Sequence, residues 1–200
     1  MANVVLVFSM SLDGYVAGPD ITTAQAMGRH GELLHQWMFE DGPAHATDRA
    51  VVREIGERVG AVLLGRRTFD VGLQHWNDTP YPVPSFVMTH EARDPMPMAS
   101  ATFTFVGAEI GEGVRRAKAA AGNLDVVVMG ADVARQVLQA DLADELFITI
   151  VPLLLGGGER LFDAIGNEPR KLAIQKVVAS PFAAHVALAL PKQQQSRTVS

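Results

Sequence analysis

The sequence predicts an α/β domain with a central, mixed and mostly parallel sheet, helices on both faces, and an antiparallel hairpin at the C-terminal end. Three observations predict this fold. Short apolar, β-branched runs recur along the chain, segments with helical spacing lie between them, and the last two extended runs follow each other directly. The 200 residues, 48% hydrophobic and 20% charged, suit a single domain, which we assign to residues 1–191.

The predicted strands are runs in which apolar residues follow one another without alternation, as expected where helices cover both faces of a sheet. They are Val4–Phe8, Ala61–Leu64, Ser85–Met88, Thr102–Val106, Asp125–Met129 and Leu146–Val151. Helices are predicted at Ala46–Arg58, at Gly113–Ala121 with Gly122 as its C-terminal cap, and at Ala131–Ala140. This alternation favours parallel strands joined by crossover helices.

The end of the chain departs from this alternation. Two extended runs, Lys171–Ala179 and Ala183–Leu190, flank the turn Ser180-Pro-Phe182 and predict an antiparallel hairpin that closes one edge of the sheet. Residues 192–200 are rich in Gln and Ser and offer nothing to bury, so we expect a disordered tail.

Composition limits the function classes. The 17 Lys and Arg against 22 Asp and Glu give a net charge of −5 without a basic cluster, so no nucleic-acid partner is expected. No apolar run approaches the length of a membrane span, and no membrane partner is expected. The chain has no Cys, which excludes disulfides and thiolate metal sites and favours the cytoplasm. Its six His lack the spacing of metal ligands, so no metal site is predicted.

The first candidate segment is Ser11-Leu-Asp-Gly-Tyr-Val-Ala-Gly18, directly after the first predicted strand, where a parallel sheet places residues that contact ligands. Asp13 offers a carboxylate for hydrogen bonding or proton transfer, and Gly14 and Gly18 allow a flat ring to approach the backbone. An ordinary Asp-Gly turn explains the same residues equally well.

Two further segments follow predicted strands. In Gly65-Arg-Arg-Thr-Phe-Asp70, Thr68 is a candidate cap of a short helix whose free amides would accept a phosphate. Arg66 and Arg67 suit a phosphate monoester such as the 2′-phosphate of NADP, and two solvated arginines are the alternative. In Met88-Thr-His90 a hydroxyl and an imidazole end another strand, for which an ordinary strand end is the stronger interpretation.

The longest candidate segment begins where a strand ends at Gly130 and a helix begins at once. This is a second helix N-terminus that can accept phosphate. Asp132 is suited to cap this helix, but its carboxylate would repel a pyrophosphate, so the backbone of Gly130 and Ala131 is the better candidate contact. The chain contains neither G-x-G-x-x-G after a strand nor a P-loop, which argues against those nucleotide folds.

In their order along the chain, these segments resemble the dihydrofolate reductase-like superfamily. Within it they resemble the reductase half of the bifunctional riboflavin biosynthesis deaminase/reductase and its free-standing relatives. The resemblance spans roughly Asn3 to Leu190. It rests on Ser11-Leu-Asp-Gly14, Gly65-Arg-Arg-Thr68, Met129-Gly-Ala131, Asp144-Glu-Leu146, Pro152 with Gly156-Gly-Gly158, and Leu161-Phe162.

The resemblance implies NADPH as hydride donor and a small-molecule substrate, a heterocycle or ring-opened ribosyl-pyrimidine, reduced at a C=N or C=O carbon. It implies cofactor contacts at Val16, Ala17 and Gly18 by the nicotinamide, at Gly65, Arg66, Arg67 and Thr68 by the phosphates, at Thr89 by the adenosine phosphate, and at Gly130, Ala131, Asp132 and Val133 along the pyrophosphate. Asp13 and Glu145 are candidates for substrate contact or proton supply, although Glu145 also fits an ordinary exposed acid at the start of a strand.

Three alternatives remain at this point. A pterin reductase is less favoured, because the stretch Gly31–Trp37 offers only Glu32 as the carboxylate that grips folate in dihydrofolate reductases. A non-catalytic NADPH-binding module fits the departure from paired glycines at Met129-Gly-Ala131. The third alternative is a structural homodimer whose interface is an apolar strand such as Phe147–Val151, and a homodimer is expected for the reductase as well. The zinc deaminase half is excluded, since no Cys exists to form its metal site.

Overall fold

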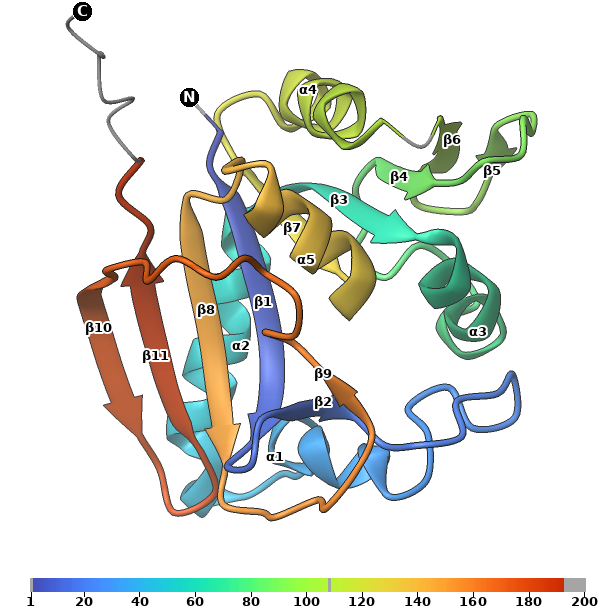
Figure 1. Ribbon diagram of the computed structural model, residues 1–200. Coiled ribbons are helices and arrows are strands. Elements are labelled where there is room, and N and C mark those ends of the chain that lie inside the picture. The colour runs from blue at the N-terminus through green and yellow to red at the C-terminus, as the bar shows by residue number, and fades with distance from the viewer. Residues whose placement is uncertain (1, 108, 193–200) are drawn as a thin grey trace, which may run out of the picture.

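The computed structural model describes residues 2–107 and 109–192 and is built around a nine-stranded sheet (Figure 1). The strands of this sheet are β1 (Val4–Ser11), β3 (Val59–Gly65), β4 (Ser85–Met88), β5 (Met96–Pro97), β6 (Thr102–Val106), β7 (Asp125–Met129), β8 (Glu145–Val151), β10 (Ala173–Ala179) and β11 (Ala184–Ala189). Their order is β10-β11-β8-β1-β7-β3-β4-β6-β5. A separate ribbon pairs β2 (Tyr15–Ala17) with β9 (Glu159–Arg160).

The sheet is mixed, as predicted. Neighbouring strands from β8 through β1, β7, β3 and β4 to β6 run parallel. The pairs β10–β11, β11–β8 and β5–β6 are antiparallel, so the C-terminal hairpin forms one edge of the sheet. The candidate interface strand Phe147–Val151 lies between β1 and β11 in the interior of the sheet. This strand therefore has no free edge for a partner, and the expectation that it forms the dimer interface is wrong.

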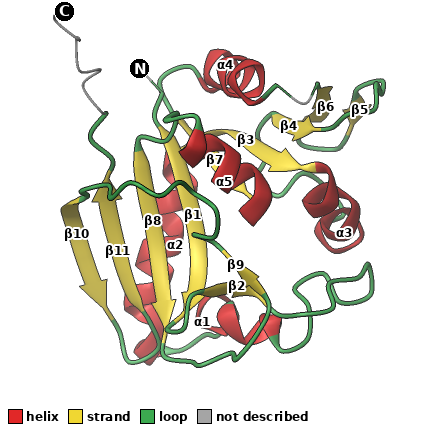
Figure 2. Ribbon diagram, in the orientation of Figure 1, coloured by secondary structure: helices red, strands yellow, loops and turns green. Residues whose placement is uncertain are grey.

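Helices cover both faces of the sheet, as Figure 2 shows. The α-helices are α1 (Gln36–Phe39), α2 (Ala46–Arg58), α3 (Arg66–Trp76), α4 (Ile110–Ala121) and α5 (Ala131–Gln139). On one face, α4 and α5 pack on a core that includes Leu6, Leu63 and Val128. On the other face, α2 and α3 pack on strand residues such as Val62 and Val127. Successive strand residues thus alternate between two cores, which explains why both positions are apolar.

The α3 helix corrects the sequence analysis. It spans Arg66–Trp76, whereas a short helix capped by Thr68 was expected, and its N-cap is Gly65. Thr68 lies inside the helix, so it does not cap it. The parallel register aligns Leu64 of β3 with Met129 of β7 and Gly65 with Met88 of β4. The turns that follow these three strands therefore lie at one edge of the sheet.

Lys192 is the one residue of the predicted tail that the structure describes. The Lys192 ammonium donates to the carbonyl of Ala143 at 2.8 Å and lies 2.9 Å from the Asp144 carboxylate, so Lys192 contacts the domain. The rest of the predicted tail, residues 193–200, lies outside the described residues. In the part of the chain that the structure describes, no helix has the length and apolar character needed to cross a bilayer.

Candidate active site

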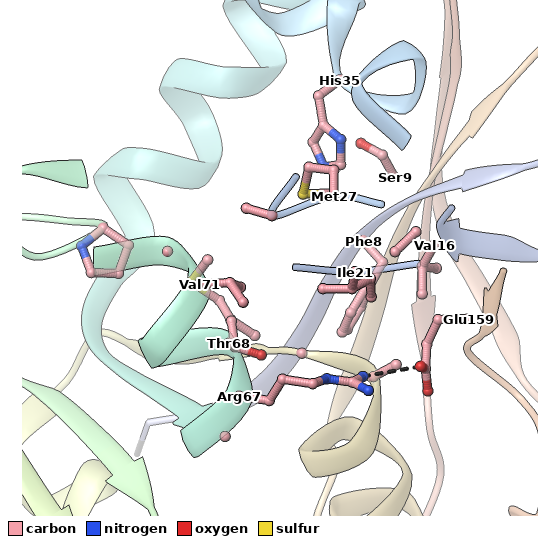
Figure 3. Close-up of a pocket in the computed structure, with 18 of the residues that line it drawn as sticks. Phe8, Ser9, Val16, Ile21, Met27, His35, Arg67, Thr68, Val71 and Glu159 are labelled. Atoms are coloured by element: carbon pink, nitrogen blue, oxygen red, sulfur yellow. Dashed lines mark hydrogen bonds and ion pairs between the residues drawn. The ribbon is translucent and has the colours of Figure 1, made fainter. Parts of the chain in front are cut away.

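A cleft of about 1780 Å³ opens at the carboxyl ends of β1, β3, β4 and β7. It is larger than the roughly 300–1,000 Å³ of a pocket that holds one small ligand. Figure 3 shows how side chains from α3, β1, β2 and the segment before α1 converge on it. Of the predicted cofactor residues, the lining includes Val16, Ala17, Gly65, Arg66, Arg67, Thr68, Thr89, Gly130, Ala131, Asp132 and Val133.

The amino termini of α3 and α5 form one end of the cleft. Among the described residues, no side chain caps the first amides of α3 or of α5, whose N-caps are Gly65 and Gly130. By contrast, the Glu109 carboxylate caps α4 by accepting from the amides of Gly111 and Glu112 at 3.1 and 2.7 Å. Free amides and the positive end of a helix dipole attract anions. The cleft therefore has two adjacent groups of donors suited to phosphate.

These two helix starts are in direct contact. Gly130 has φ +89°, and a Cβ at this position would overlap the Oγ1 of Thr68. A Cβ at Gly65 would lie 3.1 Å from Cγ2 of Val133, which is tight. The turns after β3 and β7 therefore need glycine to come this close, and no bulky side chain separates them.

Asp132 does not cap α5, contrary to the prediction. Its exposed carboxylate accepts from Nε2 of Gln136 at 2.8 Å, one turn further along the same helix. Its charge is thus directed along the helix surface, and the amides at the start of α5 remain free.

Two carboxylates hold Arg66 at the rim of the cleft. Its Nε donates to both oxygens of Asp70, at 2.9 and 2.8 Å, and its Nη1 donates to Glu91 at 2.7 Å. These bonds, those to Asp70 first, raise the pKa of Arg66 above its usual value. The Thr89 hydroxyl accepts from the Glu91 amide at 3.1 Å, which places Thr89 at the same corner. This corner places the Arg66 guanidinium, paired with two carboxylates, beside the Thr89 hydroxyl.

Arg67 crosses the cleft. Its Nη2 donates to Glu159 of β9 at 2.9 Å, drawn as a dashed line in Figure 3. Arg135 of α5 donates to the other oxygen of Glu159 at 2.8 Å. Burial acts to raise the pKa of Glu159, but the hydrogen bonds from Arg135 and Arg67 prevail and lower it. Glu159 is thus an ionised anchor that ties α3 and α5 to the β2–β9 ribbon.

Gly18 is the predicted cofactor residue that the cleft lining omits. Its amide donates to the carbonyl of Met27 at 2.8 Å, and a Cβ here would overlap the backbone of Arg29. Gly18 is therefore required by the close packing of the segment between β2 and α1. Its neighbours Val16 and Ala17 are buried in β2 and do face the cleft.

The two predicted catalytic carboxylates lie elsewhere. Asp13 accepts from the amides of Leu155 and Gly156 at 3.0 and 2.8 Å. A hydrogen bond from the Ser11 side chain and these two amides hold its pKa at about 2, so it carries no proton at neutral pH. It is absent from the lining of the cleft among the described residues. Proton supply by Asp13 is therefore contradicted by its surroundings.

Glu145 lies at the opposite end of the sheet. It is the first residue of β8, paired with Val5 near the start of β1. Its carboxylate is buried and accepts from Nη1 and Nη2 of Arg58 at 3.1 and 2.8 Å. Glu145 anchors the end of α2 to the sheet, and the expectation that it contacts substrate is wrong.

The sequence analysis missed a polar wall at the other end of the cleft. Ser9 of β1 accepts from Nε1 of Trp37 at 3.0 Å, and Thr149 of β8 is bonded to His185 at 2.9 Å. Burial lowers the pKa of His35, and its Nδ1 has no hydrogen-bond partner within residues 2–107 and 109–192. Ser9, His35, Trp37 and Thr149 all line the cleft. The signal in the sequence was the hydroxyl residues within apolar strands.

Comparison with known proteins agrees with this geometry. The model of the RibD C-terminal domain family matches residues 2–186. A structure from Shewanella sp. PV-4, provisionally assigned to riboflavin biosynthesis, is 26% identical with a TM-score of 0.72, and the match covers 96% of this chain and 99% of that chain. A search of curated protein sequences found no match.

Two more distant structures share the fold. One is a Thermotoga maritima diaminohydroxyphosphoribosylaminopyrimidine deaminase/5-amino-6-(5-phosphoribosylamino)uracil reductase (14% identity, TM-score 0.64, 95% of this chain and 57% of that chain). The other is an Enterococcus faecalis dihydrofolate reductase (13% identity, TM-score 0.54, 94% and 96%). With the dihydrofolate reductase-like fold and a family match over nearly its whole length, the chain belongs to the RibD C-terminal domain family, oxidoreductases of the riboflavin-pathway reductase type.

Proposed function

We propose that this chain is an NADPH-dependent reductase that delivers a hydride to a C=N or C=O carbon of a small heterocyclic or ring-opened ribosyl substrate. One observation carries the proposal. The free amides of α3 and α5 meet at one end of a large cleft, and hydroxyl and imidazole groups line its other end. One end suits the phosphates of a dinucleotide, and the other suits a polar ring.

The residues at the anion end fit a dinucleotide phosphate. The Gly130 turn forms a cradle that a Cβ would disrupt, since that Cβ would overlap Thr68. Beside it, Arg66 and Thr89 supply a guanidinium and a hydroxyl for the extra phosphate that distinguishes NADPH from NADH. The dihydrofolate reductase that shares this fold was solved with NADP(H), which supports the same cofactor here.

A bound nicotinamide would supply the hydride, and this chain would bind, orient and desolvate the reactants. Val16 and Ala17 offer a buried apolar surface between the two ends of the cleft. At the substrate end, His35 has a buried Nδ1 without a partner, and the Ser9 hydroxyl, which accepts from Trp37, retains its own proton to donate. These groups suit the exocyclic oxygens and nitrogens of a pyrimidine.

The test combines binding and turnover. NADPH and NADH are titrated by fluorescence, and NADPH oxidation is then followed with 5-amino-6-(5-phosphoribosylamino)uracil and with dihydrofolate. We expect NADPH to bind more tightly than NADH and the pyrimidine to be reduced. Turnover of dihydrofolate alone would favour the pterin reductase, and tight NADPH binding without any turnover would favour the binding module. Failure to bind either dinucleotide would overturn the proposal.

A further inference from the structure

A line of buried polar groups runs from the cleft into the domain. Thr149 of β8, which lines the cleft, is bonded through Oγ1 to Nδ1 of His185 on β11 at 2.9 Å. The other ring nitrogen of His185, Nε2, lies 2.9 Å from Oδ1 of Asp48, near the start of α2. Thr149, His185 and Asp48 are 2%, 1% and 0% exposed. We call these three residues the relay.

The fold holds the relay rigidly. Thr149 and His185 are direct partners in the β8–β11 ladder, and Asp48 reaches His185 from the helix that covers this face. The Trp37 ring packs edge-on against the imidazole, with centroids 4.8 Å apart. Burying a carboxylate and an imidazole costs free energy of folding unless the two groups are hydrogen-bonded or paired. No other part of the proposed function uses Asp48 or His185.

Asp48 is the charged group in direct contact with His185, and other titratable groups lie further out. Asp48 is the carboxylate bonded to the ring, and its second oxygen, Oδ2, has no hydrogen-bond partner in the described part of the chain. This oxygen faces Nδ1 of His45 at 3.8 Å, and Nε2 of His45 lies 3.5 Å from the exposed Glu40. On the neighbouring β10, Lys176 is neutralised by Glu54 at 2.6 Å. A carboxylate oxygen accepts, so Nε2 of His185 donates in its bond to Asp48.

The single proton of the Thr149 hydroxyl couples the ring to the cleft. When Nδ1 of His185 carries no proton, the hydroxyl donates to it. When Nδ1 is protonated, it donates to the hydroxyl oxygen, and the hydroxyl proton is free to point into the cleft. The order hydroxyl, imidazole, carboxylate is that of catalytic triads, in which the carboxylate fixes the ring and stabilises its charge.

We infer that Thr149, His185 and Asp48 supply the proton of the reduction, an inference that rests on the proposed function. As the hydride forms the new C–H bond, the substrate nitrogen or oxygen takes the hydroxyl proton of Thr149. Thr149 takes the Nδ1 proton of His185 at the same time, which leaves a neutral ring still bonded to Asp48 through Nε2–H. After the product leaves, water in the open cleft returns one proton through Thr149. Thr149 is the catalytic residue, and His185 and Asp48 are positioning residues.

One test reads the ring directly and needs no turnover. In protein labelled with ¹⁵N-histidine, we expect NMR to show both ring nitrogens of His185 protonated at neutral pH in the wild type and in Thr149→Val. In Asp48→Asn we expect a neutral ring. A neutral His185 in the wild type would overturn the relay.

A second test measures the hydride step in the preformed NADPH complex across pH. We expect Thr149→Val to slow this step at least tenfold, with NADPH affinity within twofold of the wild type, and Thr149→Ser to restore most of the rate. His185→Gln should slow the hydride step to the same rate and remove its pH dependence. The double variant Thr149→Val with His185→Gln should be no slower than either single variant, because the effects of groups that act as a unit are not additive. Thr79→Val, which removes a buried hydroxyl outside the cleft lining, is the matched control and should leave the rate unchanged.

The outcomes separate the two proposals. If the wild type reduces no substrate, both fall. If the wild type turns over while His185→Gln keeps its rate and pH profile, the relay alone is overturned. Should Asp48→Asn fail to fold, Thr149→Val and Thr149→Ser still decide the matter, because both retain the His185–Asp48 bond.

Discussion

Replacing Gly130 by alanine tests whether the contact between the two helix starts builds the anion end of the cleft. Two costs add at this position. The positive φ of +89° costs a side-chain-bearing residue about 1–3 kcal/mol. The new Cβ would also overlap Oγ1 of Thr68, and forcing an extra methyl group into a packed site costs about 1–3 kcal/mol. Gly130→Ala should therefore lower the free energy of unfolding by about 2–6 kcal/mol.

The matched control is Gly122→Ala. Gly122 also has a positive φ, +64°, but a Cβ there would meet nothing within 4 Å, so only the strain of about 1–3 kcal/mol applies. In a Thr68→Ala background the nearest remaining atom, the Cβ of residue 68, would lie 3.4 Å from the new Cβ, which is ordinary contact. The cost of Gly130→Ala should fall there by about 1–3 kcal/mol. Urea unfolding measures all four variants, and equal costs for Gly130→Ala in both backgrounds would refute the contact.

NADPH titration of the same variants connects this packing to the site. Gly130→Ala shifts the start of α5 away from α3, so we expect NADPH affinity to fall at least tenfold. Gly122→Ala lies at the far end of α4 and should leave affinity unchanged. Unchanged affinity in Gly130→Ala would mean that these amides do not hold the dinucleotide.

Four further predictions follow from the contacts. Arg66→Ala should weaken the binding of NADPH about tenfold and change the binding of NADH little. Equal losses of affinity for the two dinucleotides in fluorescence titration would contradict a role of Arg66 at the extra phosphate. Folding lowers the pKa of Asp13 from 3.8 to about 2, so the ionised carboxylate stabilises the protein above pH 3.8, and this contribution is lost as pH falls through about 2. Asp13→Asn should therefore lower the melting temperature at neutral pH, and the melting temperature of this variant should fall less steeply between pH 3.8 and pH 2. Glu145→Gln should lower the free energy of unfolding in urea by about 1–3 kcal/mol and leave turnover intact. The loss is smaller than the roughly 3–5 kcal/mol for breaking a fully buried ion pair, because the Arg58 side chain is 36% exposed. We propose that the protein forms a homodimer by pairing two copies of the edge strand β10. Val177 on this strand is 58% exposed, so Val177→Lys should convert the dimer to a monomer in sedimentation. A dimer that survives this substitution would exclude β10 as the interface.

The sequence predicted the elements whose stability is local. β4, β6, β7 and α2 have the predicted bounds, because uninterrupted apolar runs and a regular helical spacing need no distant contact to be recognised. The α3 helix was largely missed for a physical reason. Gly72 interrupts its interior and lowers its helix propensity, and the ring of Trp76 fills the space that a Cβ of Gly72 would occupy. Tertiary packing therefore compensates for a local weakness.

The candidate site divides in the same way. The anion end depends on helices that begin directly after strands, which the sequence shows within a few residues. The two carboxylates were misassigned because their partners are distant in sequence: Asp13 binds amides 142 and 143 residues away, and Glu145 binds a guanidinium 87 residues away. A sequence shows that a carboxylate is present but not which donors satisfy it. The relay has the same character, with Asp48 and His185 separated by 137 residues.

This division bears on how substrate choice changes within the family. The anion end is made mainly of backbone amides, which survive most substitutions provided that Gly130 and the helix starts are kept. The substrate end is made of side chains on different elements, where a single exchange at Ser9, His35 or Thr149 alters the hydrogen bonds offered to the ring. Members of one family can therefore keep the fold and the backbone amides while these side chains differ. Exchanges at these three residues should change the substrate preference of this chain before they change its affinity for NADPH.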